Sequence, residues 1–273
     1  MIKRDLELAG LRFGGTSWVT PGTFADNMRC LFPDVSDMEI VLFDTPEHSN
    51  MPSKDEIRAL RDLCSELDMS CTVHFPAEIC VSCSASERQE REDMCLRTIE
   101  LFAPLDPFAW ILHVVGEKRG NFPSAEIDSW LEKSIKSAGT IAGAVDDSRK
   151  ICIETLDYDP SYVGHLAGSA GTSICLDIGH LIKCGRPVLE TAASLADDVR
   201  VLHTHGVMAD GTDHRDLSYF DPGLFESVTE MMSGGNERVM TIEVFEDDYS
   251  RSIEALKKMK NDIGSPVLTG RQY

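Results

Sequence analysis

The feature that most constrains this chain is a regular alternation of short apolar runs with longer amphipathic segments. The apolar runs are rich in β-branched and aromatic residues, as in "AWILHVV" (109–115), and helix-like patterns such as "SKDEIRALRDLCSEL" (53–67) lie between them. Parallel strands need a crossover helix to return the chain, so this order predicts an α/β fold with a parallel sheet. The predicted strands are residues 11–18, 38–44, 69–75, 109–115, 150–156, 173–179, 199–206 and 238–245.

Eight strands followed by eight helical segments predict a single (β/α)8 TIM barrel, and 273 residues is a suitable length for one. A doubly wound sheet would normally carry a GxGxxG turn after its first strand, and "GGTSW" (14–18) is a different sequence. No low-complexity linker divides the chain. We therefore expect one TIM-barrel domain over residues 1–273.

The charge balance restricts the partners of this protein. With 26 Lys and Arg against 46 Asp and Glu, the net charge of −20 disfavours nucleic acid and anionic membrane surfaces. No segment approaches the roughly 20 apolar residues of a membrane-spanning helix, and the first residues do not resemble a signal peptide. The nine cysteines are scattered, and the single CxxC at 80–83 has no second pair, which indicates reduced thiols. We expect a cytoplasmic protein that acts on a small molecule.

Residues that can bind metals stand at the ends of six consecutive predicted strands, from the third to the eighth. In a TIM barrel these strand ends meet at one face, where active sites lie. The clearest case is "SICLDIGH" (173–180), an apolar strand that ends in an acid and an imidazole around a glycine. The full set is His74, His113, Glu154, Asp177, His180, His203, His205 and Glu243, together with Asp213 and His214 in "DGTDHRDL" (210–217).

Carboxylates and imidazoles that converge in one mouth need a cation to compensate them, so this set predicts bound divalent metal. Mixed imidazole and carboxylate donors suit Zn²⁺, Mn²⁺, Fe²⁺ or Co²⁺ better than Ca²⁺. Alternation places His203 and His205 on the same side of their strand, and which of them binds metal stays open. Candidates for substrate contact are Thr16 and Ser17 after the first strand, and the cations Lys118 and Arg119 in "GEKRG" (116–120), which would hold a phosphate.

The stretches "TVHFP", "ILHVVGE", "CIETL", "CLDIGH", "HTHG", "DHRDL" and "TIEVFE" together resemble the xylose isomerase-like TIM barrels. That superfamily holds sugar isomerases and epimerases as well as phosphodiesterases of the endonuclease IV type. The isomerase branch implies one metal, held by Glu154, Asp177, His203 or His205, and Glu243. The endonuclease IV branch implies a three-metal site, for which the further candidates are His74, His113, His180, Asp213 and His214. Asp213 and His214 are adjacent here, whereas that branch separates the pair by one residue, so two or three metals are expected.

A closer resemblance is to the cobamide-remodelling phosphodiesterases of the CbiR family. It rests on "CTVHFPAEI" (71–79), "PLDPFAWILHV" (104–114), "SICLDIGHLIKCG" (173–185), and "HTHGV" followed by "DHRDL". It implies metal-dependent hydrolysis of the nucleotide loop of a cobamide, and we assign Glu154 and Glu243 as the catalytic carboxylates. The alternative is a sugar or sugar phosphate isomerase or epimerase, in which the same two carboxylates move a proton between adjacent carbons. A third possibility is a metal-dependent binding protein without activity.

Overall fold

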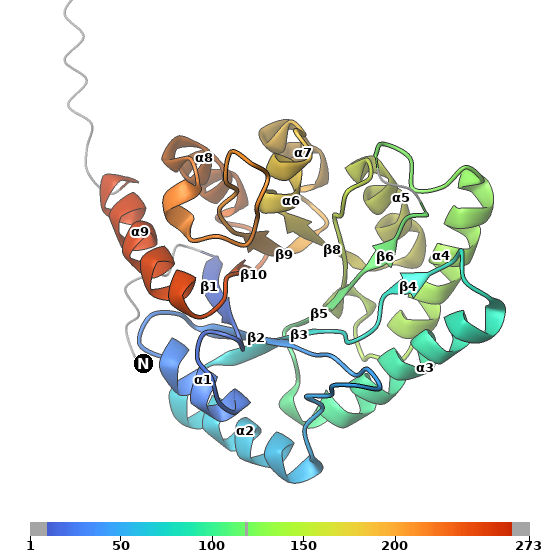
Figure 1. Ribbon diagram of the computed structural model, residues 1–273, viewed down its shortest axis with the longest axis horizontal. Coiled ribbons are helices and arrows are strands. Elements are labelled where there is room, and N and C mark those ends of the chain that lie inside the picture. Colours follow the sequence, from blue (N-terminus) through green and yellow to red (C-terminus); the bar gives the residue numbers. More distant parts are fainter. Residues whose placement is uncertain (1–9, 118–119, 264–273) are drawn as a thin grey trace, which may run out of the picture.

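The structure, a computed structural model, describes residues 10–117 and 120–263. Its central feature is a closed barrel of eight parallel strands, in the order β1-β10-β9-β8-β7-β5-β3-β2, with helices around the outside (Figure 1). The predicted TIM barrel is therefore confirmed. The barrel strands are β1 (Leu11–Thr16), β2 (Asp37–Val41), β3 (Ser70–His74), β5 (Ala109–Leu112), β7 (Ile151–Glu154), β8 (Ser173–Asp177), β9 (Val199–Thr204) and β10 (Arg238–Ile242).

All eight predicted strands are present, but each ends one to three residues earlier than its apolar run. The run 109–115 shows why. Its last residues leave the barrel and form β6 (Val114–Val115), which pairs with β4 (Ile79–Cys80) in a separate two-stranded sheet. Apolar character continues past the barrel because Val114 is buried in the large hydrophobic cluster, so periodicity alone could not locate the strand ends.

The helices begin where the sequence supplies caps. Ser53 and Ser84 each accept a hydrogen bond from the backbone of a glutamate three residues later, whose side chain bonds back to the serine. The helix after β7 begins at Pro160, with Asp159 as its cap. Two helices rather than one follow β8. The described helices are α1 (Phe24–Leu31), α2 (Lys54–Leu67), α3 (Ala85–Phe102), α4 (Ile127–Ala142), α5 (Pro160–Ala170), α6 (Ile178–Lys183), α7 (Val188–Leu195), α8 (Pro222–Met232) and α9 (Asp247–Ile263).

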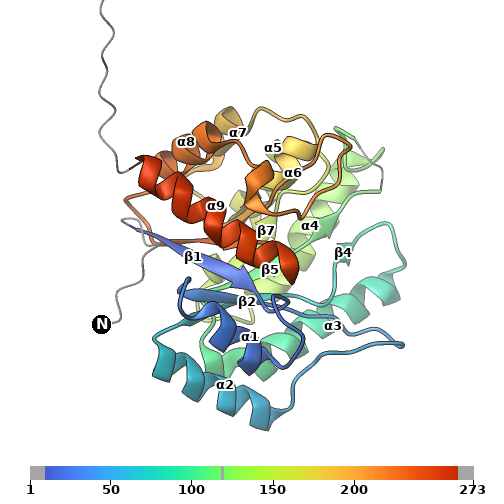
Figure 2. The ribbon, with the colours of Figure 1, turned by 60° about the vertical axis from the view of Figure 1, so that its left-hand side comes forward.

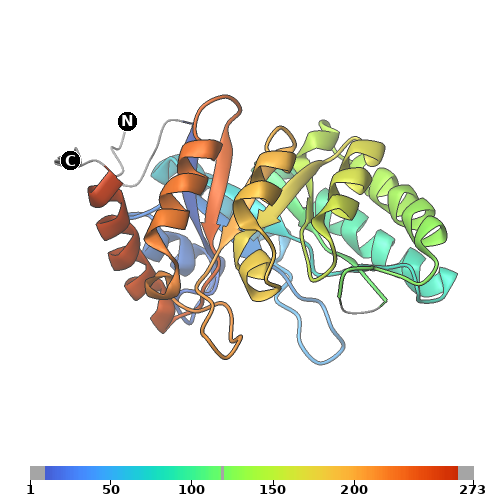
Figure 3. The ribbon, with the colours of Figure 1, turned by 90° about the horizontal axis from the view of Figure 1, so that it is seen from above.

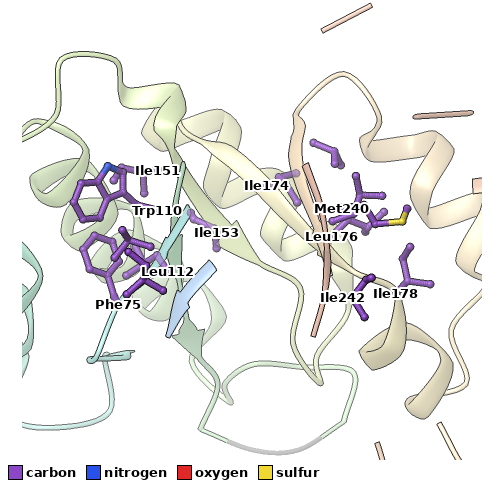
Figure 4. Close-up of a cluster of buried hydrophobic side chains, with 14 of the residues drawn as sticks. Phe75, Trp110, Leu112, Ile151, Ile153, Ile174, Leu176, Ile178, Met240 and Ile242 are labelled. Carbon is purple, nitrogen blue, oxygen red and sulfur yellow. The ribbon is translucent and has the colours of Figure 1, made fainter. Parts of the chain in front are cut away.

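Alternation along the strands divides the buried residues into two sets. Trp110 and Leu112 of β5 belong to the large cluster between strands and helices, where the Trp110 ring stacks on Phe75 at 5.4 Å (Figure 4). Ala109 and Ile111, which alternate with them, belong to a small second cluster with residues of β7, β8 and β9. The second set therefore faces the inside of the barrel. Its members are Ala109, Ile111, Cys152, Cys175 and Val201.

The loops at the carboxyl ends of the strands gather on one side of the molecule. The ribbon viewed from above shows the segments after β2 and β9 projecting from the same edge (Figure 3), and the turned view shows α9 crossing beside β1 (Figure 2). Among the described helices, none has the length and apolar character needed to cross a membrane. The prediction of one domain over residues 1–273 includes segments outside the described residues and stays a prediction.

Candidate metal centre

The polar residues predicted at the strand ends lie together at the carboxyl end of the barrel. His74, Glu154 and Asp177 are the last residues of β3, β7 and β8, and His113 and Glu243 directly follow β5 and β10. Within each strand they share the alternation of the residues that face the barrel interior, so their side chains turn toward its axis. This end of the barrel, called the mouth below, brings together side chains that are far apart in the sequence.

Glu154 lies at the centre of the mouth and is only 1% exposed. Its Oε2 atom is 3.0 Å from Nε2 of His113, 3.7 Å from Nε2 of His74 and 3.6 Å from Nδ1 of His203. Its Oε1 atom is 3.6 Å from Nδ1 of His180. Burial alone would raise the pKa of Glu154, but the His113 and His203 imidazoles hold it well below its usual range. One ionised carboxylate thus borders four imidazoles.

His74, His113 and Glu154 form a first group of possible metal donors, with ligand atoms within 4.8 Å of one another. The Nε2 atoms of the two histidines are 3.1 Å apart. On its other side, His113 places Nδ1 3.5 Å from the Glu78 carboxylate. Burial opposes protonation of His113, but Glu154 and Glu78 raise its pKa to about 10. The pairing with Glu154 and Glu78 therefore favours the protonated form of His113 in metal-free protein.

The stretch "LDIGH" explains how Asp177 and His180 come to share the mouth. Asp177 caps α6, and its Oδ1 accepts the backbone N–H of His180 at 2.8 Å. The first turn of the helix then brings Nδ1 of His180 to 3.0 Å from Oδ2 of Asp177. Gly179 leaves room for the His205 ring, because a Cβ at this position would lie 2.1 to 2.4 Å from the ring atoms. Asp177, Gly179 and His180 therefore form one capped helical turn whose side chains share the mouth.

His205 is completely buried and faces Asp177, with Nε2 3.4 Å from Oδ1. Its Nδ1 accepts the backbone N–H of His214 at 3.0 Å, and the two rings stack at 4.2 Å. His214 has a left-handed backbone, with φ of 54°, and places Nε2 3.5 Å from Oε2 of Glu243. A second group of possible donors consists of His180, His205 and His214.

His203 connects the mouth to a residue that the sequence analysis missed. Its Nε2 lies 2.9 Å from Oε2 of Glu39 in β2, a completely buried carboxylate that also accepts the Thr241 hydroxyl at 3.1 Å. Nδ1 of His203 then points toward Glu154 and Glu243, at 3.6 and 3.3 Å. An acid in the middle of the apolar run "MEIVLF" (38–43) was the available signal.

Asp213 lies at the edge of the mouth and is paired with a lysine. Its Oδ2 is 2.6 Å from Nζ of Lys183, and its Oδ1 is 3.4 Å from Nδ1 of His214. Although partial burial opposes ionisation, Lys183 and His214 lower the pKa of Asp213 to about 2. Lys183 and Arg186 also line a hollow of about 540 Å³ that opens beside His180. These two cations were not among the predicted site residues.

The predicted substrate contacts are placed as follows. The hydroxyl of Thr16 is buried and donates to the backbone carbonyl of Val244 at 2.8 Å, so it joins the loops after β1 and β10. Ser17 is mostly buried, accepts the N–H of Val41 at 3.0 Å, and lines a second hollow. Lys118 and Arg119 lie outside the described residues.

The donor atoms of the mouth fit a bound cation. Nδ1 of His203 and Oε2 of Glu243 are buried and lie 3.3 Å apart, yet within the described part of the chain neither has a hydrogen-bond partner. Buried polar atoms without partners are costly, and a divalent ion ligated by imidazole and carboxylate would satisfy them. The choice among Zn²⁺, Mn²⁺, Fe²⁺ and Co²⁺ is left open by these donors.

Residues 35–259 match the family described as xylose isomerase-like TIM barrel, and the chain belongs to this family. The predicted superfamily is thereby confirmed. A search of curated protein sequences found no match.

Solved structures of similar fold are numerous. One is a D-tagatose 3-epimerase-like protein, with a TM-score of 0.72 and 21% identity over 93% of this chain and 98% of that chain. Another is the IolI protein with a bound zinc atom, with a TM-score of 0.70 and 12% identity over 92% and 97%. A third is the D-allulose 3-epimerase from Methylomonas sp. in complex with D-allulose, with a TM-score of 0.66 and 14% identity over 92% and 96%. Identities this low show a shared fold.

Proposed function

We propose that the mouth is a centre for two or three divalent metal ions in an enzyme that hydrolyses the phosphodiester of a small molecule. The observation that carries this proposal is the position of Glu154 between separate donor groups. One oxygen meets the His74 and His113 pair, and the other meets His180, which also contacts Asp177. A single ion needs three or four protein ligands, so this arrangement offers more donors than one ion can use.

In this proposal each carboxylate of the mouth has a distinct task. Glu154 holds the two donor groups together, as its burial and low pKa require. Glu243 is the more exposed of the two, at 12% against 1%, and is placed to take the proton of the attacking water. Of the two strand-nine histidines, we assign His203 as a ligand through Nδ1, because Glu39 occupies its Nε2. His205 is assigned to orient Asp177, since its Nδ1 already accepts a backbone N–H.

Bound divalent ions would lower the pKa of water and stabilise the charge that builds on the phosphoryl oxygens. The water oxygen forms the new bond to phosphorus, and the bond from phosphorus to the departing oxygen breaks. That oxygen needs a proton as it leaves. Since His180 is assigned to the metal ions together with Glu154 and Asp177, the donor would be His214, whose ring centroid lies 6.0 Å from that of His180.

The substrate we propose is a cobamide, cleaved at its nucleotide loop. The support is the resemblance of the sequence to the CbiR family and the acidic chain, which disfavours a polynucleotide. We also keep a cytoplasmic location as a prediction, which is consistent with nine free cysteines.

A second function is favoured by the structural comparisons, in which epimerases are prominent, whereas none of the three proteins described above is named as a phosphodiesterase. In an epimerase or isomerase of a sugar or sugar phosphate, Glu154, Asp177, His203 and Glu243 would hold one ion. Glu154 and Glu243 would then move a proton between adjacent carbons. An epimerase with one ion would not use His74 and His113 as ligands. Their position beside Glu154 therefore supports the hydrolase.

The deciding experiment measures metal content and both activities in one preparation. Chain purified without chelator and reloaded with Zn²⁺, Mn²⁺, Fe²⁺ or Co²⁺ is incubated with a cobamide and, separately, with D-allulose or D-tagatose. We expect more than one metal equivalent per chain, and release of a nucleoside from the cobamide as seen by chromatography. One equivalent of metal together with keto-sugar interconversion would establish the epimerase instead, and binding without turnover of either would indicate a non-catalytic protein.

A further inference from the structure

Trp18 differs from the other two tryptophans of the chain. Trp110 and Trp130 are buried, at 2% and 1% exposure, and pack in the core. Trp18 follows β1 by two residues and is 36% exposed. Because Trp18 lies at the carboxyl end of the barrel beside a hollow, its exposed ring can be reached by a ligand.

The Trp18 ring is held in a fixed position. It packs against the Phe43 ring at 5.0 Å between centroids, and its backbone carbonyl accepts the N–H of Glu246 at 2.9 Å. Glu246 adopts a left-handed backbone, with φ of 36°, three residues after Glu243. The ring is thus tied to the loops after β2 and β10, and a ligand that stacks on it loses little of its binding free energy to ordering the protein.

Trp18 borders a hollow of about 410 Å³, a size within the range of small-molecule sites. The apolar part of its wall comes from Pro21, Phe24, Met51 and Pro52. Glu56 and Glu246 also line it, and Oε2 of Glu56 accepts the backbone N–H and the hydroxyl of Ser53. Apolar walls and a flat indole suit an aromatic ring, while carboxylates accept hydrogen bonds from N–H and O–H groups and repel anions.

The hollow lies on the opposite side of the barrel from the one beside His180. The Trp18 hollow adjoins β1 and β2, whereas the other adjoins β7 and β8, four strands away in the closed barrel. The metal centre lies between them. Such an arrangement suits a substrate that extends to both sides of its reacting group, and a monosaccharide is too small to use both hollows.

We propose that the Trp18 hollow binds the aromatic heterocycle of a nucleoside, uncharged or cationic, that forms one arm of the substrate. The identification of this ring as part of the substrate rests on the proposed phosphodiester hydrolysis. The stacking itself needs no metal. Binding to the hollow and chemistry at the mouth can therefore be tested separately.

The test uses the fluorescence of the full chain, because Trp18 is the exposed tryptophan. Metal-free protein is titrated with a benzimidazole ribonucleoside and, as a control, with ribose 5-phosphate, which has no aromatic ring. We expect saturable quenching by the nucleoside and no saturable quenching by the control. In Trp18→Leu the saturable quenching disappears, and in Trp18→Phe competition by the nucleoside with a fluorescent benzimidazole probe is retained.

Activity gives an independent readout. Stacking of a base on an aromatic ring contributes enough that Trp18→Leu should raise the KM for the cobamide about 10-fold, while kcat and thermal stability change little. Absence of saturable quenching, or equal quenching in wild type and Trp18→Leu, overturns the proposed subsite. Saturable quenching in a protein that cleaves no cobamide would uphold the aromatic subsite and remove the phosphodiester assignment.

Discussion

The two ends of the barrel use charged residues in opposite ways. At the amino end, the guanidinium groups of Arg12 and Arg200 both lie over the Phe108 ring, at 4.6 and 4.3 Å from its centroid. Arg200 also donates to the Phe108 carbonyl at 2.9 Å, and Arg12 pairs with Glu237 at 2.8 Å. Arg238, only 6% exposed, donates to a set of backbone carbonyls: those of Ala196, Val199, Met232, Gly234 and Asn236.

At the mouth, by contrast, buried charges face one another. Glu154 meets four imidazoles, and Nδ1 of His203 and Oε2 of Glu243 have no hydrogen-bond partner within the described residues. The arginines of the amino end are bound by protein groups, although Oδ1 of the buried Asp37 has no hydrogen-bond partner there in the described part of the chain. The mouth differs because its unpartnered atoms belong to side chains that bind metals and lie around one ionised carboxylate. This difference predicts that substitutions at the two ends change different observables.

The largest effect is expected for Glu154→Gln. The amide cannot supply a second anionic oxygen to the donor groups it borders, so turnover should fall by about 10³-fold or more. Metal content should fall with it. The measurement is steady-state turnover with metal analysis of the same sample.

A matched control for this change is Glu92→Gln. Glu92 is also a buried carboxylate, but it bonds Ser137 on the outside of the barrel, and its amide variant should keep full turnover. Equal losses in the two variants would mean that buried charge in general, rather than the mouth, limits activity.

The next effect belongs to the amino end. Arg238→Met removes the donor for several buried carbonyls, and the free energy of unfolding should fall by about 3 kcal/mol. Urea denaturation of metal-free protein measures this change. Turnover per folded molecule should stay at the wild-type value. A loss of turnover without a loss of stability would contradict the assignment of the amino end to stability alone.

His180→Ala should lower turnover by about 10²-fold and remove one metal equivalent, because His180 joins Glu154 and Asp177 within one donor group. His165→Ala is the control, since that histidine is exposed on α5. An epimerase that uses one ion held by Glu154, Asp177, His203 and Glu243 would tolerate the His180 change, so retained epimerase activity would decide for the second function.

The sequence predicted the barrel and most of the mouth because both follow from local patterns. Apolar runs located the strands, and the polar residue at each strand end was visible from its position alone. In "SICLDIGH" the acid and the imidazole were visible, but the cap by Asp177 that begins α6 at Ile178 was not predicted. Strand ends were misplaced, since Val114 and Val115 are as apolar outside the barrel as inside it.

What the sequence could not show depends on contacts between distant segments. Glu39 and His203 are far apart in the chain, and only the closed barrel brings their side chains to 2.9 Å. The different surroundings of His203 and His205 are equally invisible, because alternation places both on one side of the strand. Lys183 was overlooked since a lysine on a short helix has no distinctive pattern until Asp213 lies beside it.

Glu39→Gln should produce a smaller change than the ligand substitutions. Glu39 accepts the Nε2 proton of His203 and so keeps the Nδ1 lone pair toward the mouth, and the amide does this less strongly. We expect metal affinity about 10-fold weaker, measured by competition with a chelating dye. Glu39→Asp retains the charge at a greater distance, so its metal affinity should lie between those of the wild type and Glu39→Gln. Unchanged affinity in both variants would limit Glu39 to a structural role.

The smallest expected effect is a dependence of folding stability on pH that originates in the mouth. In metal-free protein, burial lowers the pKa of His113, but Glu154 and Glu78 outweigh it and raise the pKa to about 10. A folded-state pKa above the unfolded value of about 6.5 means that this pairing stabilises the fold fully below about pH 6.5. The stabilisation is then lost as the pH rises toward 10.

Metal binding should release the proton of His113. An imidazole must be neutral to bind a metal ion, so Zn²⁺ uptake near pH 7 should release about one proton from His113. Calorimetry in two buffers of different ionisation enthalpy measures the number released, and His113→Ala should reduce it while Arg200→Ala leaves it unchanged. Zinc uptake without proton release would mean that His113 keeps its proton beside Glu154 and is no ligand. The contrast between the ends would then rest on Glu154, Asp177 and the remaining histidines, since their distances do not depend on His113.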